Sequence, residues 1–300
     1  LPPFAGGGIE ANGSMYSVGK SDDTLYKLSA TYTIDDDKMV YALFSQGFRI
    51  GGVNSPRAAA TGEVGETFDA DYMDNYEVGI KSNWMDNRLQ LNAQYFLMQW
   101  SDMQIAHWGG VGPWWVGGTV NAETAESSGL EMDIKYQITE NLNISGAAIF
   151  NDAKFTKEYV SPAGSVYRDN MVMPNSPDRS GYVGITYEKP DVAGGDLWVY
   201  YSISYQSESW NRTGNIIDND INGISPSHKN SNFSIGLDNL GDGWNVTLYI
   251  DNVFDQATYS FVNTNANTYT DLFGTNSQRN VRSLAQPRTT WLTVRKTFGK

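Results

Sequence analysis

The sequence contains no cysteine, only two histidines and no long run of apolar residues. The absence of thiols excludes disulfide scaffolds, thiolate metal sites and cysteine nucleophiles. His107 and His228 alone supply too few ligands for a histidine-based metal site, and each is predicted to be a surface loop residue rather than a catalytic base. No window approaches the roughly eighteen consecutive apolar residues that a transmembrane helix requires. These absences exclude a helical membrane protein but not a membrane β-barrel, whose strands alternate and are polar on average.

Basic residues are also scarce, and the formal net charge is −13. A protein that binds nucleic acid needs a basic stripe to neutralise phosphates, so nucleic acid is excluded as a partner. The chain carries neither the G-x-S-x-G motif of serine hydrolases nor the H-E-x-x-H motif of zinc proteases. We therefore expect no enzymatic activity and no cofactor.

The dominant feature that is present is alternation at a period of two residues. Residues 89–95 alternate apolar side chains with glutamine and asparagine, and residues 130–138 alternate them with Glu131, Asp133 and Lys135. A helix over the second segment would bury these charges, so strands are favoured. Eleven strands are predicted, at residues 25–34, 38–48, 75–84, 88–102, 125–138, 142–155, 180–188, 197–208, 232–239, 244–254 and 289–298.

The connections between these strands alternate strictly in length. Short turns, rich in turn-forming residues, are predicted at residues 35–37, 85–87, 139–141, 189–196 and 240–243. Long connections are predicted at residues 49–74, 103–124, 156–179, 209–231 and 255–288. In an up-and-down meander this order places every short turn at one end and every long loop at the other. That asymmetry is typical of transmembrane barrels, and a soluble β-sandwich has no reason to show it.

The two faces of the predicted strands differ in a way that favours lipid over a protein core. The face opposite the apolar one is persistently polar, bulky and mixed in charge, which suits a wet or plugged lumen. Aromatic residues near strand ends are candidates for membrane-interface girdles, although each alone is equally an ordinary packed strand residue. They are Tyr32, Trp84, Tyr136, Tyr187, Tyr205, Trp244 and Phe298.

Several segments carry a resemblance to a known family. They are, in order, YALFSQGFRIGGVN at residues 41–54, NYEVGIKSNW at 75–84, GLE at 129–131, DNVFD at 251–255, PRT at 287–289, and a last strand that ends in Phe298. Over roughly residues 24–298 this order and spacing resembles the carboxy-terminal barrel portion of TonB-dependent outer-membrane receptors. Gly299 and Lys300 depart from the pattern, because an aromatic residue usually ends such a chain.

The resemblance implies an all-β fold, an antiparallel up-and-down transmembrane β-barrel of about 22 strands with a plugged lumen. This chain would supply about half of it, eleven or twelve strands. Residues 1–24 are then expected to form an outer loop or partial strand and residues 25–298 the barrel strands, without the amino-terminal plug domain. Side chains expected to line the lumen or contact the plug are Glu77, Lys81, Glu131, Asp133 and Lys135.

A smaller closed barrel is the alternative architecture, and it needs a twelfth strand because bacterial barrels normally have an even number. Residues 10–19 are the candidate, but they alternate poorly. An open sheet edge in hydrocarbon leaves unpaired backbone groups that cost several kcal/mol each. We therefore do not expect eleven strands to transport anything by themselves.

The most unusual stretch, HWGGVGPWW at residues 107–115, lies in a long outer loop. Three tryptophans among glycine and proline do not easily form a core, and exposed aromatics of this kind suit ligand stacking. We predict Trp108, Trp114 and Trp115 as ligand-binding residues, with Trp210 and Arg212 of another long loop as further candidates. The alternative is that the tryptophans pack on one another or rest in the membrane interface.

One segment matches the start of a calcium-binding loop. Asp218, Asp220 and Asn222 occupy the spacing D-x-D-x-N-G. Lys229 stands where the motif needs a bidentate glutamate, and its ammonium would repel the metal. We therefore expect a solvated acidic loop rather than a calcium site.

The resemblance implies an active transport receptor in the outer membrane of a Gram-negative bacterium. Such a receptor takes up a scarce nutrient, for example a siderophore–iron complex. Its partners would be outer-membrane lipid, the plug domain and the remaining barrel strands, the TonB complex acting through the plug, and the small-molecule nutrient. Alternatives from the residues are a passive porin-like or smaller enzymatic barrel, and a soluble carbohydrate-binding all-β module that would bind through the tryptophan-rich loop.

Overall fold

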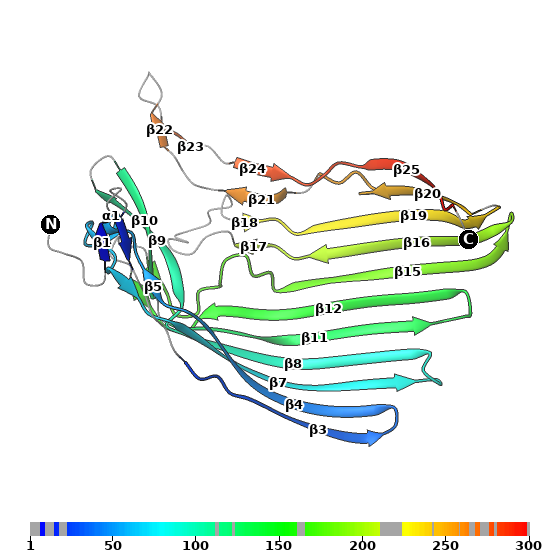
Figure 1. Ribbon diagram of the computed structural model, residues 1–300, viewed down its shortest axis with the longest axis horizontal. Coiled ribbons are helices and arrows are strands. Elements are labelled where there is room, and N and C mark those ends of the chain that lie inside the picture. Colours follow the sequence, from blue (N-terminus) through cyan, green and yellow to red (C-terminus); the bar gives the residue numbers. More distant parts are fainter. Residues whose placement is uncertain are drawn as a thin grey trace.

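The computed structural model describes residues 7–9, 15–17, 23–111, 114–121, 124–160, 166–210, 224–241, 243–257, 259–263, 268–270, 276–278 and 281–298. Its main body is one antiparallel sheet of eleven long strands (Figure 1). Neighbouring strands of this sheet follow one another along the chain, and the shorter strands between them form separate pairs. The strands are β3 (Lys27–Asp35), β4 (Lys38–Arg49), β7 (Asp71–Trp84), β8 (Leu89–Ser101), β11 (Ala125–Gln137), β12 (Leu142–Phe155), β15 (Arg179–Val192), β16 (Gly195–Gln206), β19 (His228–Leu240), β20 (Trp244–Asp251) and β25 (Thr289–Lys296). All eleven predicted strands are confirmed, in the predicted up-and-down order.

Four boundaries differ from the prediction by three residues or more: β7 and β19 begin four residues earlier, β15 ends four residues later and β20 ends three residues earlier. The differences at β7 and β15 have a physical reason. Strand β7 begins at Asp71 rather than at residue 75, because Asp71 pairs with Arg49 in the ladder and their side chains form an ion pair. Strand β15 continues to Val192, past the predicted end at residue 188. The register shifts between Lys189 and Val192, at Pro190, which has no N–H for the ladder and is tolerated at such an irregularity.

The five short turns lie at one end of the sheet and the five long connections at the other (Figure 1). The long connections contain short pairs of their own: β5 (Gly52–Val53) with β6 (Thr67–Phe68), β9 (Gln104–Val111) with β10 (Trp114–Asn121), β13 (Tyr159–Val160) with β14 (Val166–Tyr167), β17 (Ser209–Trp210) with β18 (Ile224–Ser225), β21 (Tyr259–Asn263) with β24 (Val281–Leu284), and β22 (Thr268–Thr270) with β23 (Asn276–Gln278). Helix α1 (Pro56–Ala59) has four residues. Within the described ranges no helix combines the length and apolar character of a membrane span.

Cross-strand register sorts the side chains onto two faces. Val78, Tyr95, Leu130 and Phe150 lie directly opposite one another on successive strands, and we call their side of the sheet the apolar face. Their relative exposures range from 38% to 56%, so the chain does not cover this face with a core of its own. The other side, which we call the polar face, carries the row that contains Gln94 and Glu131.

Exposed aromatic residues collect on the apolar face near the short turns. Tyr32, Trp84, Tyr187 and Trp244 are all exposed there. The ammonium groups of Lys38 and Lys296 lie 4.5 Å and 4.8 Å from the ring centroids of Trp84 and Trp244. Phe298 is also exposed, just beyond β25. Of the other two girdle candidates, Tyr136 is half-buried and Tyr205 lies at the opposite end of its strand.

A small hydrophobic core lies at the long-loop end. Met103, Ala125 and Phe155 are buried there. The half-buried residues that pack against them are Trp100, Ile105, Tyr159, Met171 and Met173. The connection between β12 and β15 therefore folds back onto the wall of the sheet instead of extending freely.

The sheet has two open edges, β3 and β25. Because eleven is an odd number, these two strands run in the same direction, so they do not match as antiparallel neighbours. Residues 15–17, within the proposed twelfth strand, form β2 (Met15–Ser17), which pairs with β1 (Gly7–Ile9) and not with the main sheet. The described residues therefore form part of a barrel wall and not a smaller closed barrel.

Candidate functional site

Two long connections are joined at the long-loop end into a unit that we call the outer clasp, made of residues 49–71 and the β9–β10 hairpin. Asn54 is its central contact. The Asn54 amide donates to the carbonyl oxygens of Gly65 (2.9 Å) and Thr119 (2.8 Å), and its oxygen accepts from the Thr119 amide (2.6 Å). Asn54 is only 6% exposed. A buried side chain with all these bonds fixes the position of β10 relative to the preceding loop.

A second set of contacts ties the base of the hairpin to the same loop. The Asn121 oxygen accepts from the Asp69 amide (2.8 Å), and its NH₂ donates to the carbonyls of Asp69 (3.0 Å) and Asp102 (2.8 Å). The Gln104 side chain donates to the carbonyls of Ile50 (2.9 Å) and Asp69 (3.0 Å). Two amide side chains thus satisfy backbone groups that no strand pairing reaches.

An ion pair anchors the outer clasp to the sheet. The Asp71 carboxylate is 1% exposed and pairs with the Arg49 guanidinium, whose Nε lies 3.0 Å from each carboxylate oxygen. The backbone N–H of Gln104 also donates to the Asp71 carboxylate (2.9 Å). The guanidinium carbon lies 4.8 Å from the Trp100 ring centroid. Asp71 therefore connects β4, β7 and β9 through a single buried group.

A buried histidine makes a further contact within the outer clasp. His107 Nε2 lies 3.2 Å from a carboxylate oxygen of Glu63, and His107 is 6% exposed. The prediction that His107 is a surface loop residue is therefore wrong. His107 directly precedes Trp108, so this contact holds β9 against the loop close to the tryptophan-rich segment.

The three predicted tryptophans of residues 107–115 lie on the β9–β10 hairpin. In the backbone register Trp108 pairs with Gly117, Trp115 with Gly110 and Trp114 with Val111. The structure describes only the backbone of these three residues. Their hairpin belongs to the outer clasp, so the backbone that carries them is held by Asn54, Asn121 and His107.

The remaining predicted ligand residues lie in a different loop pair. Trp210 is half-buried in β17, and its carbonyl accepts from the Asn175 amide (2.6 Å). The two loops are also joined where Ser207 and Arg179 exchange hydrogen bonds. The Ser207 hydroxyl lowers the pKa of the Asp178 carboxyl below its usual range. Arg212 and the weak calcium candidates Asp218, Asp220 and Asn222 lie outside the described residues.

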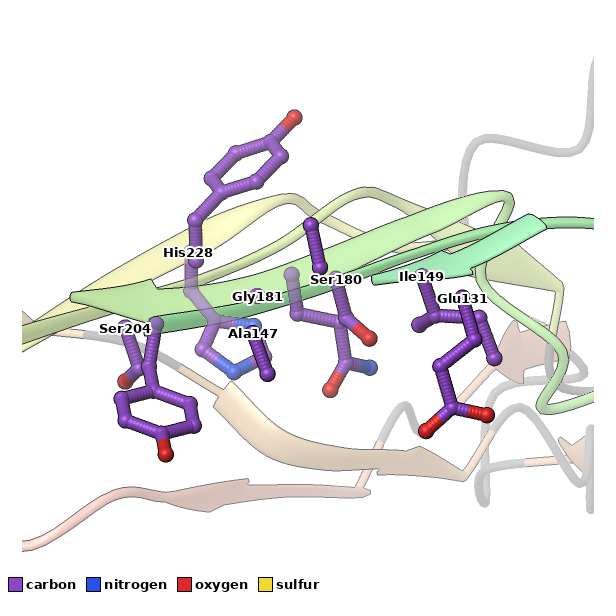
Figure 2. Close-up of a pocket in the computed structure, with 11 residues that line it drawn as sticks. Glu131, Ala147, Ile149, Ser180, Gly181, Ser204 and His228 are labelled. Atoms are coloured by element: carbon purple, nitrogen blue, oxygen red, sulfur yellow. The ribbon is translucent and has the colours of Figure 1, made fainter. Parts of the chain in front are cut away.

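Below the loops, the polar face holds a groove of about 380 Å³ (Figure 2). Glu131, Ile149, Ser180, Gln206 and His228 form a continuous cross-strand row from β11 to β19. In Figure 2 the side chains of Glu131, Ser204 and His228 project to the same side of the sheet. The groove thus presents a carboxylate, hydroxyls, an amide and an imidazole.

Hydrogen bonds hold the acidic end of this groove. The Gln94 NH₂ donates to one Glu131 oxygen at 3.0 Å, and the Tyr41 hydroxyl donates to the Gln94 oxygen. In the neighbouring row the Asn92 NH₂ donates to Asp133 at 3.0 Å. Among the residues that the structure describes, these carboxylates are therefore positioned by neutral donors from adjacent strands and not by ion pairs.

With this geometry, comparison with known proteins identifies the family. Residues 6–253 match the family model described as "TonB dependent receptor-like, beta-barrel". This chain belongs to the TonB-dependent receptor family. Its members are outer-membrane β-barrel proteins of Gram-negative bacteria that act as transport receptors rather than enzymes.

Individual relatives agree with this assignment. The pesticin receptor of Yersinia pestis is 27% identical over 253 residues, covering 82% of this chain and 34% of the relative. The probable TonB-dependent siderophore receptor PiuA of Acinetobacter baumannii is 25% identical over 183 residues, covering 56% and 23%. The solved ferric yersiniabactin uptake receptor FyuA from Yersinia pestis shares the fold with a TM-score of 0.69 and 19% identity, covering 92% of this chain and 37% of that one. The chain spans about a third of the length of the pesticin receptor and of FyuA.

In a TonB-dependent barrel the polar face is the lumenal face. Register places all five predicted lumenal residues, Glu77, Lys81, Glu131, Asp133 and Lys135, on it. Sequence reasoning missed Ser180, Ser204, Gln206 and His228, which line the groove beside Glu131. His228 is the first residue of β19 and not part of a surface loop as predicted. The alternation Ser202, Ser204, Gln206 was the available signal for the groove.

Proposed function

We propose that this chain forms the carboxy-terminal part of the barrel of a receptor that imports a scarce nutrient, such as a siderophore–iron complex, across the outer membrane. Transport is energised by the TonB complex through an amino-terminal plug domain that occupies the lumen. The observation that carries this proposal is the eleven-strand meander with all long connections at one end of a polar wall. The two relatives named as a siderophore receptor and a ferric yersiniabactin uptake receptor support the class of cargo.

In this proposal the long-loop end faces outward and the short turns face the periplasm. The apolar face contacts outer-membrane lipid, and its exposed aromatics with Lys38 and Lys296 lie at the inner interface. On the polar face, Glu77, Lys81, Glu131, Asp133 and Lys135 contact the plug or line the path of the nutrient. Nutrient binds first between the outer loops, by stacking on the predicted residues Trp108, Trp114, Trp115, Trp210 and Arg212.

The test of transport is uptake by a strain that lacks its own siderophore receptors and expresses the full-length receptor. Cells are given radioactive iron bound to purified siderophores, with and without an intact TonB gene. We expect accumulation of iron that disappears without TonB. Uptake that persists without TonB contradicts the proposal and identifies a passive porin-like barrel.

The test of nutrient binding is the double substitution Trp114→Ala and Trp115→Ala. We expect the dissociation constant for the transported siderophore to rise about tenfold, because buried aromatic contacts dominate binding energy. Trp244→Ala is the matched control, since Trp244 lies at the short-turn end of the sheet and should leave affinity unchanged. Equal effects of the two changes would assign the tryptophans to stability and not to binding.

A further inference from the structure

The groove on the polar face has an unusual charge composition. Its ionisable lining residues include Glu131 and His228, and the described lining residues include no lysine or arginine. Glu131 is exposed to the groove and has one oxygen engaged by Gln94. Asp133 lies in the adjoining row, two residues further along β11. A ligand in the groove itself therefore meets a carboxylate and neutral hydrogen-bonding groups. The cations of the polar face lie outside the groove: Lys81 lines the neighbouring cavity with Glu131 and Asp133, and Lys135 lies further along β11.

The nearest cations in the sequence are excluded from the groove by the register of the strands. Arg179 directly precedes Ser180 and Lys229 directly follows His228. Successive residues of a strand point to opposite faces, so both cations lie on the other side of the sheet. Arg179 pairs with Phe150 and Lys229 with Tyr205, which are residues of the apolar face. The described contacts of Arg179 include an ion pair with Asp178 at 3.4 Å.

The long connections beside the groove also carry a net negative charge. Residues 102–124 contain Asp102 and Glu123 and no lysine or arginine, and residues 207–227 contain three carboxylates and one arginine. Residues 156–178, between them, contain three carboxylates and two cations. Charge of one sign around an entrance raises the local concentration of the opposite sign and lowers that of the same sign. The sequence of the outer loops and the geometry of the groove therefore favour the same class of ligand.

We infer that this receptor selects a neutral or cationic metal chelate and rejects polyanionic ones, because the described lining of the groove from Glu131 to His228 offers acceptors and hydroxyls and includes no lysine or arginine. This inference rests on the proposed function and names the charge class of the cargo. A chelate with amine or hydroxyl groups donates to Glu131 and Gln206, and it is oriented by His228. A tris-catecholate complex, whose surface is anionic, leaves its charge unpaired against the same wall.

The test compares two probes on the full-length receptor in detergent: a ferric trihydroxamate that carries a free ammonium, and a ferric tris-catecholate. Binding is followed by quenching of tryptophan fluorescence at two salt concentrations. We expect the trihydroxamate to bind at least about tenfold more tightly at low salt and to weaken as salt is added. The tris-catecholate should gain affinity with salt, because screening reduces repulsion.

Two substitutions place the selectivity in the groove. Glu131→Gln should reduce the preference for the cationic probe severalfold, whereas Glu126→Gln should not. Glu126 is a matched control, because it lies on β11, accepts a hydrogen bond from Gln99 at 3.3 Å and belongs to the opposite face. Ser180→Lys adds a cation to the groove and should shift the preference toward the tris-catecholate.

The outcomes separate this inference from the proposed function. Tighter binding of the tris-catecholate by the unaltered receptor, or an equal response to Glu131→Gln and Glu126→Gln, overturns the inference and leaves receptor function intact. Failure of both probes to bind, together with absence of TonB-dependent uptake, contradicts the proposed function itself. Preference for the trihydroxamate that Ser180→Lys reverses supports both.

Discussion

The two ends of the sheet are built by different means. At the short-turn end each turn is closed by contacts that are local in sequence: the Asp37 amide donates to Asp35 (3.0 Å), and the amides of residues 141 and 142 donate to the Thr139 hydroxyl at 3.2 Å and 3.1 Å. Longer-range bonds there join one turn to the next, as when the Arg88 guanidinium donates to the Ile138 carbonyl at 2.6 Å. At the long-loop end the corresponding contacts join distant residues, such as Asn54 with Thr119. The short turns themselves can be read from neighbouring residues, whereas the outer clasp exists only when the sheet has brought its strands together.

The two ends also differ in the entropy cost of forming their contacts. Contacts that close long loops must first offset the entropy of bringing their ends together. At the long-loop end this cost is offset by hydrogen bonds and ion pairs of side chains that are almost completely buried, those of Asp71, Asn54 and His107. The short-turn end has exposed ion pairs such as Lys38 with Asp35, which contribute little. Substitutions at the two ends should therefore differ in how much local stability they remove and in how many strands they affect.

The largest effect is expected for Asp71→Ala. Removal of the carboxylate leaves Arg49 and the Gln104 amide without a buried partner, and we expect local stability to fall by about 3 kcal/mol. Hydrogen exchange measured by mass spectrometry should show faster exchange at Gln104 and through β9. Asp35→Ala, which removes an exposed ion pair at the other end, is the control and should change exchange only in its own turn. If exchange in β9 stays slow, the ion pair does not anchor the outer clasp.

A smaller effect is expected for Asn54→Ala. The change leaves the Thr119 amide and two carbonyls without their partner, which should cost about 2 kcal/mol in local stability. Exchange should accelerate across the β9–β10 hairpin while the eleven-strand sheet stays protected. Thr139→Ala at the short-turn end is the control, because its hydroxyl accepts, among the described residues, only from the neighbouring amides of Asn141 and Leu142, and it should have a smaller, local effect. Acceleration that spreads through β11 and β12 would contradict the description of the outer clasp as a separate unit.

The smallest effect is expected for Met85→Gly, and its sign is opposite. Met85 has a φ of 57°, a left-handed conformation that costs a residue with a Cβ atom about 1 kcal/mol. Glycine removes this strain but adds freedom to the unfolded chain, so we expect stabilisation by about 0.5 kcal/mol. Urea unfolding of the receptor in lipid vesicles measures the change. Asn87→Gly is the control, because asparagine tolerates its φ of 65°, and it should alter stability by less. A destabilising Met85→Gly would show that the turn is held by the side chain of Met85.

The regular part of the molecule was predictable because its physics is local. Alternation at a period of two located all eleven strands, and clusters such as Met85-Asp86-Asn87 located the turns between them. The same alternation placed Glu77, Lys81, Glu131, Asp133 and Lys135 on one face, as the register confirms. Where the prediction failed at the start of β7, a non-local interaction was responsible, because the pairing of Asp71 with Arg49 extends this strand.

The site was only partly predictable. The tryptophans of residues 107–115 stood out by composition, and their role in binding stays a prediction. The residues that hold their hairpin did not stand out, because Asn54 and His107 look like ordinary loop residues until Thr119 and Glu63 are brought beside them. The groove was missed for a similar reason. Ser180, Gln206 and His228 come from three strands, and only pairing across the sheet makes them one row.

The sequence by itself determined the strands, their order, the sorting of turns from loops and the separation of a polar from an apolar face. These features depend on alternation and turn chemistry, which act over a few residues. Tertiary structure alone decided which loop side chains meet in the outer clasp, and that Arg179 and Lys229 lie behind the groove while Ser180 and His228 line it. The reason is register, because a shift of a single residue in any strand would exchange the two faces and change the charge of the groove.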